Sequence, residues 1–438
     1  MVAILGRVKF SAQSKAGLLL FLTTFVVFLA TMGRFLSWDV VTANVAAWHL
    51  VSTGSPWIEN TDLLQDHPLR NIWIVEVDGH EVVARAPGVI IANLPAYWLF
   101  RPSEYSGIPG GLTAAFLSSF SVLFVYLASV TRLSIKASVI AAVVFGFGSP
   151  VWAVAADAMW PHTITVFGIT GMAWAAAKER WWLVGLFGGV ALTGRVHAAV
   201  IVAVVGLGVA IVRRRPSVLV KTAIPSTAIL GLTLVWNRWL YHSWNPTGGY
   251  QIDGSTDVGE RYSSLLTNEL GLWVAPDRGI LIWTPIFIFM LPAVFRAWSD
   301  VPDWSKLLAF AGLIYSFLQG WANVFHGGDF FWSYRLGLEF VACATPLFAF
   351  SIPRLGATAR KVVPIVAGFQ ILFIGIGAAL SIPGLAASEA WSNNVVVKML
   401  ATEPFAAVGL LAVAFMVIKL ITRVVGPVSD CLAPETDG

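Results

Sequence analysis

The stretch AGLLLFLTTFVVFLATMGRFL, residues 16–36, decides the fold class of this chain. Its only charged residue is Arg34, and its length is close to the ~20 apolar residues that a helix needs to cross a bilayer. Similar runs recur at Ile365–Ser381 and Phe405–Ile421. Of the 438 residues, 57% are hydrophobic and 12% are charged, whereas soluble globular chains carry about 25% charged residues. The sequence therefore predicts an all-α, polytopic membrane protein.

Apolar runs separated by short loops predict about twelve transmembrane helices. These spans are expected near residues 16–36, 110–130, 137–156, 162–177, 181–195, 197–212, 220–240, 279–295, 307–322, 336–352, 362–382 and 404–422. Basic clusters such as Arg213–Arg215 then fall on one side, which the positive-inside rule assigns to the cytoplasm together with both chain ends. The net charge of +4 is small, so these clusters indicate membrane orientation rather than nucleic-acid binding. The first run is too long for a signal-peptide core and lacks a cleavage site, so we expect it to be retained.

The predicted membrane domain covers residues 1–423, and residues 424–438 form a cytoplasmic tail that is too short to bury a core. Three outer loops are expected, at residues 37–109, 241–278 and 323–335. Within the first loop, Pro87–Phe100 is apolar, but as a helix it would reach only about 21 Å against a hydrocarbon core of about 30 Å. We interpret it as a re-entrant or interfacial helix. If it spanned the membrane instead, the cluster at residues 213–215 would lie outside.

Histidine and arginine gather on the predicted outer face. All the histidines fall there: His49, His67, His80, His162, His197, His242 and His326. The outer arginines are Arg34, Arg70, Arg85, Arg101, Arg195, Arg238, Arg261, Arg278 and Arg335, accompanied by a single lysine, Lys398. Because arginine binds planar anions bidentately and tolerates partial burial, this bias favours a phosphate-bearing ligand at the outer membrane surface.

Asp39 lies directly after the first span, beside Trp38 and ahead of a helical pattern that contains Asn44, Trp48 and His49. A carboxylate at the boundary between water and lipid is expected to have a raised pKa, which suits a general base. Asp39 is therefore the candidate catalytic residue. The alternative is a structural role as a helix N-cap.

The run HGGDFFWSYR, residues 326–335, combines a base, an acid, a guanidinium and four aromatic rings around a turn that its two glycines permit. Arg335 would hold a phosphate or carboxylate, and the rings would stack on a sugar. His326, Asp329 and Arg335 are therefore candidate substrate-binding residues. The alternative is an interfacial aromatic belt, with Arg335 paired to Glu339 one helical turn later.

Four further candidates for substrate binding lie near predicted helix ends on the outer side: Arg85, His162, Arg195 and Arg278. Arg195 interrupts an apolar region, where a cation is costly, so a partner or an anionic ligand is expected. Arg278 follows Asp277 in a turn that is explained equally well as a capped helix start. His162 is explained as well by a solvated position at a helix end.

Known metal and nucleophile motifs are absent from the sequence, which contains no HExxH, CxxC, DxD, GxSxG or Walker A pattern. His326 and Asp329 could share a divalent cation, but two ligands do not make a metal site. No metal and no cofactor is therefore expected. The two cysteines, Cys343 and Cys431, cannot form a disulfide framework.

Taken together, these features resemble the GT-C superfamily of membrane glycosyltransferases, which use polyprenyl-phosphate sugars as donors. The similarity rests on Asp39 directly after the first helix, followed by an amphipathic helix in a long outer loop. Further similar stretches are Arg85–Gly88 with Leu94–Pro95, Ser149–Trp152 to His162, Pro276–Gly279 and Gly327–Arg335, the last three being like those of actinobacterial members. The resemblance implies that Asp39 is the base that activates the acceptor and that arginines near the outer ends of later helices hold the lipid phosphate. The chain departs from the protein mannosyltransferases, because it lacks their paired acidic residues after the first helix and no C-terminal soluble domain is expected.

The residues and the resemblance predict transfer of a hexose or pentose from a polyprenyl-phosphate donor to a cell-envelope glycan, lipid or protein acceptor. The reaction is expected on the extracytoplasmic side of the cell membrane. The expected partners are this donor, the acceptor and the lipid bilayer, with no nucleic acid. The alternatives are a secondary transporter or flippase of lipid-linked sugars and a non-enzymatic scaffold for envelope assembly. Transport is disfavoured, because transporters place ionisable groups near the bilayer midplane and this chain places them at the outer rim.

Overall fold

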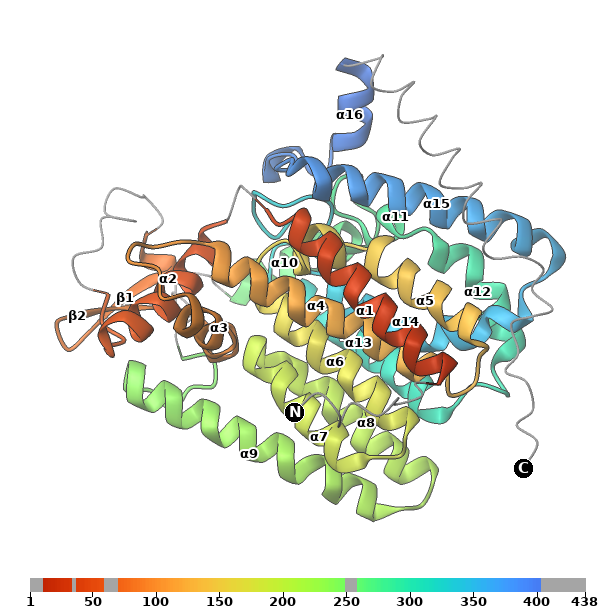
Figure 1. Ribbon diagram of the computed structural model, residues 1–438, viewed down its shortest axis with the longest axis horizontal. Coiled ribbons are helices and arrows are strands. Elements are labelled where there is room, and N and C mark those ends of the chain that lie inside the picture. Colours follow the sequence, from red (N-terminus) through yellow and green to blue (C-terminus); the bar gives the residue numbers. More distant parts are fainter. Residues whose placement is uncertain (1–10, 34–36, 59–69, 249–257, 403–438) are drawn as a thin grey trace, which may run out of the picture.

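The chain folds into a bundle of helices (Figure 1), seen in a computed structural model that describes residues 11–33, 37–58, 70–248 and 258–402. The predicted all-α, polytopic class is confirmed. Within these ranges, four helices are long and apolar enough to cross a bilayer on their own. They are α1 (Ala12–Ala30), α4 (Ile108–Ser129), α9 (Pro216–Tyr241) and α15 (Ala357–Leu380). The last predicted span, at residues 404–422, and the predicted tail lie outside the described residues.

The other predicted spans within the described ranges also fall on helices. These are α5 (Ile135–Phe147), α6 (Pro161–Ala177), α7 (Trp181–Gly194), α8 (Ala199–Val212), α12 (Ile286–Ala297), α13 (Asp303–Ala322) and α14 (Leu338–Ser351). Short turns adjoin them: η4 (Val196–Ala198) precedes α8, η5 (Ile352–Arg354) follows α14, and η6 (Ala387–Glu389) and α16 (Val395–Thr402) follow α15.

Two predicted spans are interrupted. Residues 137–156 divide into α5 and a π-helical turn, η3 (Val151–Ala155), because α5 ends at Phe147 with Gly148 as its C-cap and Pro150 has no N–H with which to continue it. Residues 279–295 divide into the short α11 (Ile280–Trp283) and α12, separated by Thr284 and Pro285. Hydropathy did not reveal these breaks, because the residues around them are as apolar as the helices.

The first predicted outer loop folds into separate elements that gather at one end of the bundle (Figure 1). They are α2 (Trp38–Thr53), η2 (Arg70–Ile72), β1 (Ile74–Val77), β2 (His80–Val83) and α3 (Pro87–Phe100). The antiparallel hairpin β1–β2 was not predicted. Its signal was Asp78–Gly79 between two runs rich in valine, since both residues adopt the positive φ that a two-residue hairpin turn requires (φ 53° and 79°).

The segment interpreted as re-entrant or interfacial forms α3, a helix of 14 residues that begins at Pro87 and continues through Pro95. It packs against α2, α4 and α7, while Ile91 and Trp98 are exposed. Its short length agrees with the expectation that it does not span a bilayer, and its placement in the membrane stays a prediction. The second predicted outer loop, residues 241–278, contains the helix α10 (Val258–Val274), which packs against α13 and was also missed.

Close packing of the antiparallel helices α6 and α7 brings two candidate residues together. A Cβ added to Gly168 of α6 would lie 2.6 Å from the backbone N of Ala191, and one added to Gly194 would lie 2.6 Å from the carbonyl oxygen of Pro161. Small residues at such contacts allow membrane helices to approach closely. The start of α6, with His162, therefore lies beside the end of α7, with Arg195.

Candidate functional site

Asp39 lies in the first turn of α2, at the end of the bundle that carries the hairpin. Ser37 is the N-cap of this helix, and its hydroxyl accepts a hydrogen bond from the backbone N–H of Asp39. The alternative that Asp39 itself is the N-cap is therefore wrong. The positive end of the helix dipole favours an anionic side chain at this position.

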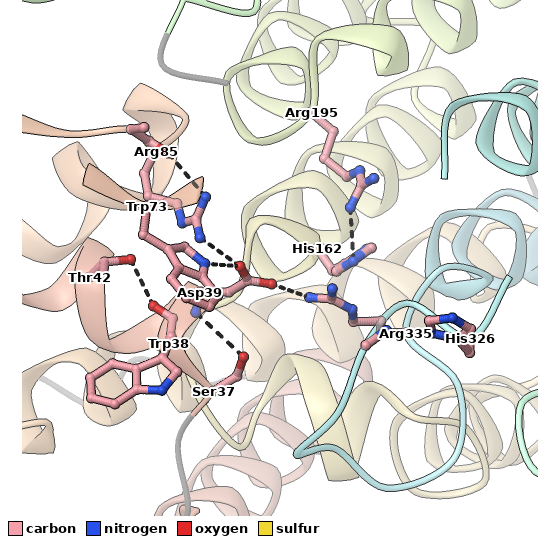
Figure 2. Close-up of polar contacts among 12 residues, drawn as sticks. Ser37, Trp38, Asp39, Thr42, Trp73, Arg85, His162, Arg195, His326 and Arg335 are labelled. Atoms are coloured by element: carbon pink, nitrogen blue, oxygen red, sulfur yellow. Dashed lines mark hydrogen bonds and ion pairs between the residues drawn. The ribbon is translucent and has the colours of Figure 1, made fainter. Parts of the chain in front are cut away.

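The carboxylate of Asp39 is held between two guanidinium groups (Figure 2). Arg85 Nη2 lies 2.6 Å from Oδ1, and Arg335 Nη1 lies 2.6 Å from Oδ2. Trp73 Nε1 also donates to Oδ1, at 2.8 Å. Burial alone would raise the pKa of Asp39, but the charges and hydrogen bonds of Arg85 and Arg335, with the Trp73 bond, outweigh it and hold the pKa well below its ordinary value. The raised pKa expected from the sequence is therefore wrong for this arrangement.

Arg85 reaches Asp39 from the segment that leaves the hairpin. Its side chain is 1% exposed, its Nη1 donates to the carbonyl of Ala84, and its Cζ lies 5.9 Å from the ring of Trp73. The following Pro87 starts α3. Neither the hairpin nor the buried position of Arg85 follows from hydropathy, although arginine at this position was identified as a candidate.

Arg335 reaches Asp39 from the predicted outer loop at residues 323–335. Gly327, Gly328, Phe330 and Ser333 adopt positive φ, so the backbone turns repeatedly before Arg335. The guanidinium lies 4.9 Å from the ring centre of Trp160 and 5.3 Å from that of Phe331, distances typical of cation–π contacts. The alternative pairing of Arg335 with Glu339 is wrong, because Arg335 pairs with Asp39 and Glu339 contacts His162.

Arg195 caps the C-terminal end of α7, where the negative end of the helix dipole favours a cation. Its Nη1 donates to Nε2 of His162 and its Nη2 to Oε1 of Gln319, each at 2.9 Å. His197 Nε2 also contacts the same Gln319 oxygen, at 2.9 Å. His162 is fully buried, so the alternative of a solvated histidine at a helix end is wrong.

Four of the candidate residues line one cavity of about 410 Å³, a volume typical of ligand pockets. They are Asp39, Arg85, Arg195 and Arg335. The rest of the wall includes Pro87, Leu192, Thr193, His197, Thr233, Asn237, Asn323 and Leu336. Among the described lining residues, three arginines face one carboxylate, so positive charge is in excess. The prediction that these side chains form one site is supported by their position, and their individual roles stay predictions.

Arg278, His326 and Asp329 are not brought to this cavity. Arg278 is buried against Asp277 at 2.8 Å and donates to the carbonyl of Ser333 at 2.9 Å, so it supports the loop that carries Arg335. His326 Nδ1 accepts from the backbone N–H of Gly328, and Asp329 accepts from that of Ala387. In this structure, these three residues hold loop segments together through these contacts rather than line the site.

Sequence reasoning missed several polar residues at or near the site, namely Trp73, Gln319, Glu339 and Asn237. Trp73 and Asn237 were assigned to an outer loop and to a helix without a reason to face the site. Gln319 lies within an apolar helix and was not considered. Its polar side chain among apolar residues was the feature of the sequence that could have identified it. Glu339 was considered only as a partner for Arg335.

Asp157, also missed, lies beside a second cavity of about 220 Å³ that includes Gly33 and Asn44. Burial raises the pKa of Asp157 to about 8. Asp157 follows the π-helical turn η3 in the hairpin that leads to α6. The carboxyl of Asp157 is therefore protonated at a pH at which an ordinary aspartate is charged.

The described part of the chain holds no group of three or more His, Cys, Asp or Glu side chains placed to bind a metal ion. Among the described residues of the cavity wall there is a single carboxylate, whose two oxygens contact arginines, and this donor set does not suit a divalent cation. Whether the protein acts without a metal or cofactor stays a prediction.

No model of a protein family matches the chain, and no curated protein matches it in sequence. Two crystal structures match it in fold over nearly its whole length. ArnT from Cupriavidus metallidurans bound to undecaprenyl phosphate matches with a TM-score of 0.52 and 12% identity, over 93% of this chain and 75% of that chain. ArnT in the apo state matches with a TM-score of 0.53 and 13% identity, over 94% and 76%. At this identity the likeness establishes the fold.

The chain therefore shares the fold of a polytopic membrane protein. The structures that it resembles are those of ArnT, and this likeness in fold agrees with the superfamily resemblance seen in the sequence.

Proposed function

We propose that this protein is a membrane glycosyltransferase. It transfers a sugar from a polyprenyl-phosphate-linked donor to a cell-envelope glycan, lipid or protein acceptor on the extracytoplasmic side of the membrane. The observation that carries the proposal is that Asp39, Arg85, Arg195 and Arg335 line one cavity. The likeness in fold to ArnT, which is solved with undecaprenyl phosphate, supports a lipid-phosphate donor.

The arginines suit a phosphate group. A guanidinium presents several N–H donors in a rigid fork that matches phosphate oxygens, and it keeps its charge when partly buried. Arg85 is 1% exposed and Arg335 is 17% exposed, so an anion that reached them would be largely removed from water. Electrostatic attraction is stronger in such surroundings.

An apolar groove beside the charged cavity suits a hydrocarbon chain. It has a volume of about 390 Å³, and it is lined mostly by aliphatic side chains of α7, α8 and α9. Leu192 belongs to both this groove and the charged cavity. On α9 the groove is lined by Leu219, Thr222, Ser226 and Leu230, and the cavity continues this face with Thr233 and Asn237. The steps of three or four residues keep these side chains on one face of the helix, so a donor with its phosphate in the cavity would extend its lipid along α9.

The proposed reaction breaks the bond between the anomeric carbon and the phosphate oxygen and forms one between that carbon and the acceptor oxygen. The acceptor proton passes to the Asp39 carboxylate, and the leaving lipid phosphate keeps the electron pair, stabilised by the arginines. Before donor binding, Arg85 and Arg335 make Asp39 a weak base. A phosphate that takes over part of their hydrogen bonding weakens this hold, raises the pKa of Asp39 and prepares it to accept the proton.

Transport of lipid-linked sugars is less well supported. The charged residues of the cavity come from helix ends and connections: Asp39 from the first turn of α2, Arg195 from the end of α7 and Arg335 from the residues before α14. Transporters usually place such groups on interrupted helices near the middle of the bilayer.

The proposal is tested with purified protein in lipid nanodiscs, incubated with a panel of undecaprenyl-phosphate sugars and a cell-envelope extract as acceptor. We expect release of undecaprenyl phosphate by the native protein and its loss, by about 100-fold or more, in Asp39→Asn. Asp78→Asn, in the exposed turn of the hairpin, is the matched control and should retain activity. Full activity of Asp39→Asn would remove the proposed base, and failure of the native protein to bind undecaprenyl phosphate would overturn the proposed donor.

A further inference from the structure

A row of buried hydrogen bonds lies behind the cavity wall and connects Glu339 to Arg195. Oε1 of Glu339 lies 2.7 Å from Nδ1 of His162, and Nε2 of His162 lies 2.9 Å from Nη1 of Arg195. The side chains of Glu339 and His162 are 0% exposed. Neither of them lines the cavity, whereas Arg195 does.

The direction of these bonds follows from the chemistry of the groups. A guanidinium can only donate, so Nε2 of His162 must accept from Arg195 and carries no proton. In a neutral imidazole the proton is then on Nδ1, which donates it to the carboxylate of Glu339. The opposite tautomer would direct an N–H at Arg195 and break the contact. Glu339 thus selects the form of His162 that can hold Arg195.

The row joins elements that are far apart in the sequence. Glu339 lies in the first turn of α14 and His162 in the first turn of α6, while Arg195 ends α7 and contacts Gln319 of α13. Figure 2 shows the contact between His162 and Arg195. The arginine is therefore held at two of its nitrogens by residues that belong to two other helices.

We propose that Glu339 is a positioning residue, which acts through His162 to fix the guanidinium of Arg195 for the phosphate of the donor. This inference rests on the proposed function. A buried hydrogen-bonded row of this kind is weak evidence for a stabilising role, because apolar residues of the same size often stabilise a fold as well. Arginine has large rotamer freedom, and a guanidinium that is already oriented loses less of it when it binds an anion.

The test is a double-mutant cycle on the binding of undecaprenyl phosphate by protein in nanodiscs. We expect Glu339→Gln to weaken binding by about tenfold, because a charge-assisted hydrogen bond in the row is lost. In the background of Arg195→Gln, the same change should have almost no further effect on binding, because the guanidinium that Glu339 positions is absent. Glu389→Gln, which breaks an exposed pair with Lys398, is the control for loss of a carboxylate and should bind normally.

A second pair of variants keeps the test decisive if Glu339→Gln does not fold. Glutamine can accept from Arg195 and donate to Glu339 with nearly the spacing of the two ring nitrogens. His162→Gln should therefore bind undecaprenyl phosphate at least about fivefold more tightly than His162→Leu, with a similar melting temperature.

Each outcome has one meaning. Equal losses on Glu339→Gln in the native and Arg195→Gln backgrounds would show a structural role and overturn the positioning inference while the proposed function stands. Equal binding by His162→Gln and His162→Leu would overturn it in the same way. Failure of the native protein to bind undecaprenyl phosphate would overturn the proposed function itself.

Discussion

In the proposed mechanism, Asp39 has two roles that compete with each other. Its two oxygens occupy Arg85 and Arg335, the groups that a donor phosphate would need, at 2.6 Å each. A bound phosphate and an ionised Asp39 therefore divide the same N–H donors. In the proposed mechanism this competition lowers donor affinity, but it also couples donor binding to the basicity of Asp39, so that the acceptor is activated only when a donor is present.

The competition predicts an unusual effect of Asp39→Asn. The asparagine amide oxygen still accepts from Arg85 and Trp73, so the protein should fold, but it neither repels phosphate nor holds the arginines as strongly. We expect undecaprenyl phosphate to bind roughly tenfold more tightly to this variant, although transfer is lost. Isothermal titration in nanodiscs measures the Kd, with Asp78→Asn as the control. Unchanged or weaker binding would show that Arg85 and Arg335 are not the phosphate ligands.

Asp157 gives a pH prediction of defined sign. Its pKa rises from 3.8 to about 8 in the folded protein, so the folded state retains a proton that the unfolded state releases. Stability from this group is complete below about pH 4 and declines as the pH rises toward about 8. The melting temperature of the native protein should therefore fall across this window, and Asp157→Asn should fall less and be the more stable of the two at pH 8. A difference between the two proteins that does not grow with pH would contradict this.

At the residue scale, sequence reasoning identified the side chains whose charge is unusual in an apolar chain. Asp39, Arg85, Arg195 and Arg335 were all candidates, because a charge near a membrane span needs a reason. It could not separate them from Arg278 and Asp329, which are charged residues in similar turns. The difference lies in tertiary contacts, because the guanidinium of Arg278 pairs with Asp277 and donates to backbone carbonyls instead of facing the cavity.

At the scale of elements, the loop from Val324 to Gly337 places Arg335 beside Asp39. Its shape depends on Gly327, whose φ is +68° and whose added Cβ would lie 3.1 Å from Nε of Arg335. Gly79 in the hairpin turn has a similar φ of +79°, with nothing within 4 Å of an added Cβ. Both glycines thus require a positive φ, but an added Cβ would have close neighbours only at Gly327.

This pair of glycines predicts a difference between two alanine variants. Gly327→Ala and Gly79→Ala should each lose about 1 kcal/mol of stability, the cost of left-handed backbone for an alanine. Gly327→Ala should also lower transfer activity by roughly tenfold, because Arg335 must move by a few tenths of an ångström. Thermal melts and initial rates measure the two effects. Equal activity of the two variants would show that the position of Arg335 does not matter.

Helices were predicted well where they are long and apolar, as for α1, α4, α9 and α15. The hairpin β1–β2 and helix α10 were missed because both lie in segments assigned to loops on hydropathy, which carries no information about polar elements. The broken spans, at Gly148–Pro150 and at Thr284–Pro285, show the opposite failure. Apolar composition masked turns that glycine and proline had signalled.

At the scale of the whole molecule, the two ends of the bundle differ in chemistry. One end carries α2, the hairpin and α3 (Figure 1). The charged cavity is lined in part by residues of these segments. The other end carries ion pairs between short loops, with Arg213 bound to Glu179 and Asp303, and Arg354 bound to Asp300. Helix α4 connects the two ends, since it starts near Tyr97 and Ser106 and leads to Arg132, which donates to the carbonyl of Asp300. Which of the two ends faces the outside of the cell stays a prediction.

The proposed sidedness makes a prediction for labelling from outside the cell. In a Cys431→Ser background, where Cys343 is buried, we introduce single cysteines at two exposed aspartates. Asp78 lies in the hairpin turn and is 69% exposed, and Asp300 lies between α12 and α13 and is 50% exposed. Because exposed ion pairs contribute little, about 0–1 kcal/mol, both variants should fold. A membrane-impermeant maleimide should label Asp78→Cys in intact cells, and Asp300→Cys only after the membrane is opened.

The reverse pattern would place the arginine cavity in the cytoplasm, and with it the proposed reaction. Labelling of both cysteines in intact cells would mean that the ends of α4 do not lie on opposite sides of the membrane, so the threading itself would be wrong. Labelling of Asp78→Cys alone requires α4 to cross the bilayer with its start outside, because Asp300 contacts the segment that follows its end. That orientation presents Arg85 and Arg335 to a lipid phosphate in the outer leaflet. Their two positive charges outnumber the single negative charge of Asp39, the carboxylate that both arginines contact.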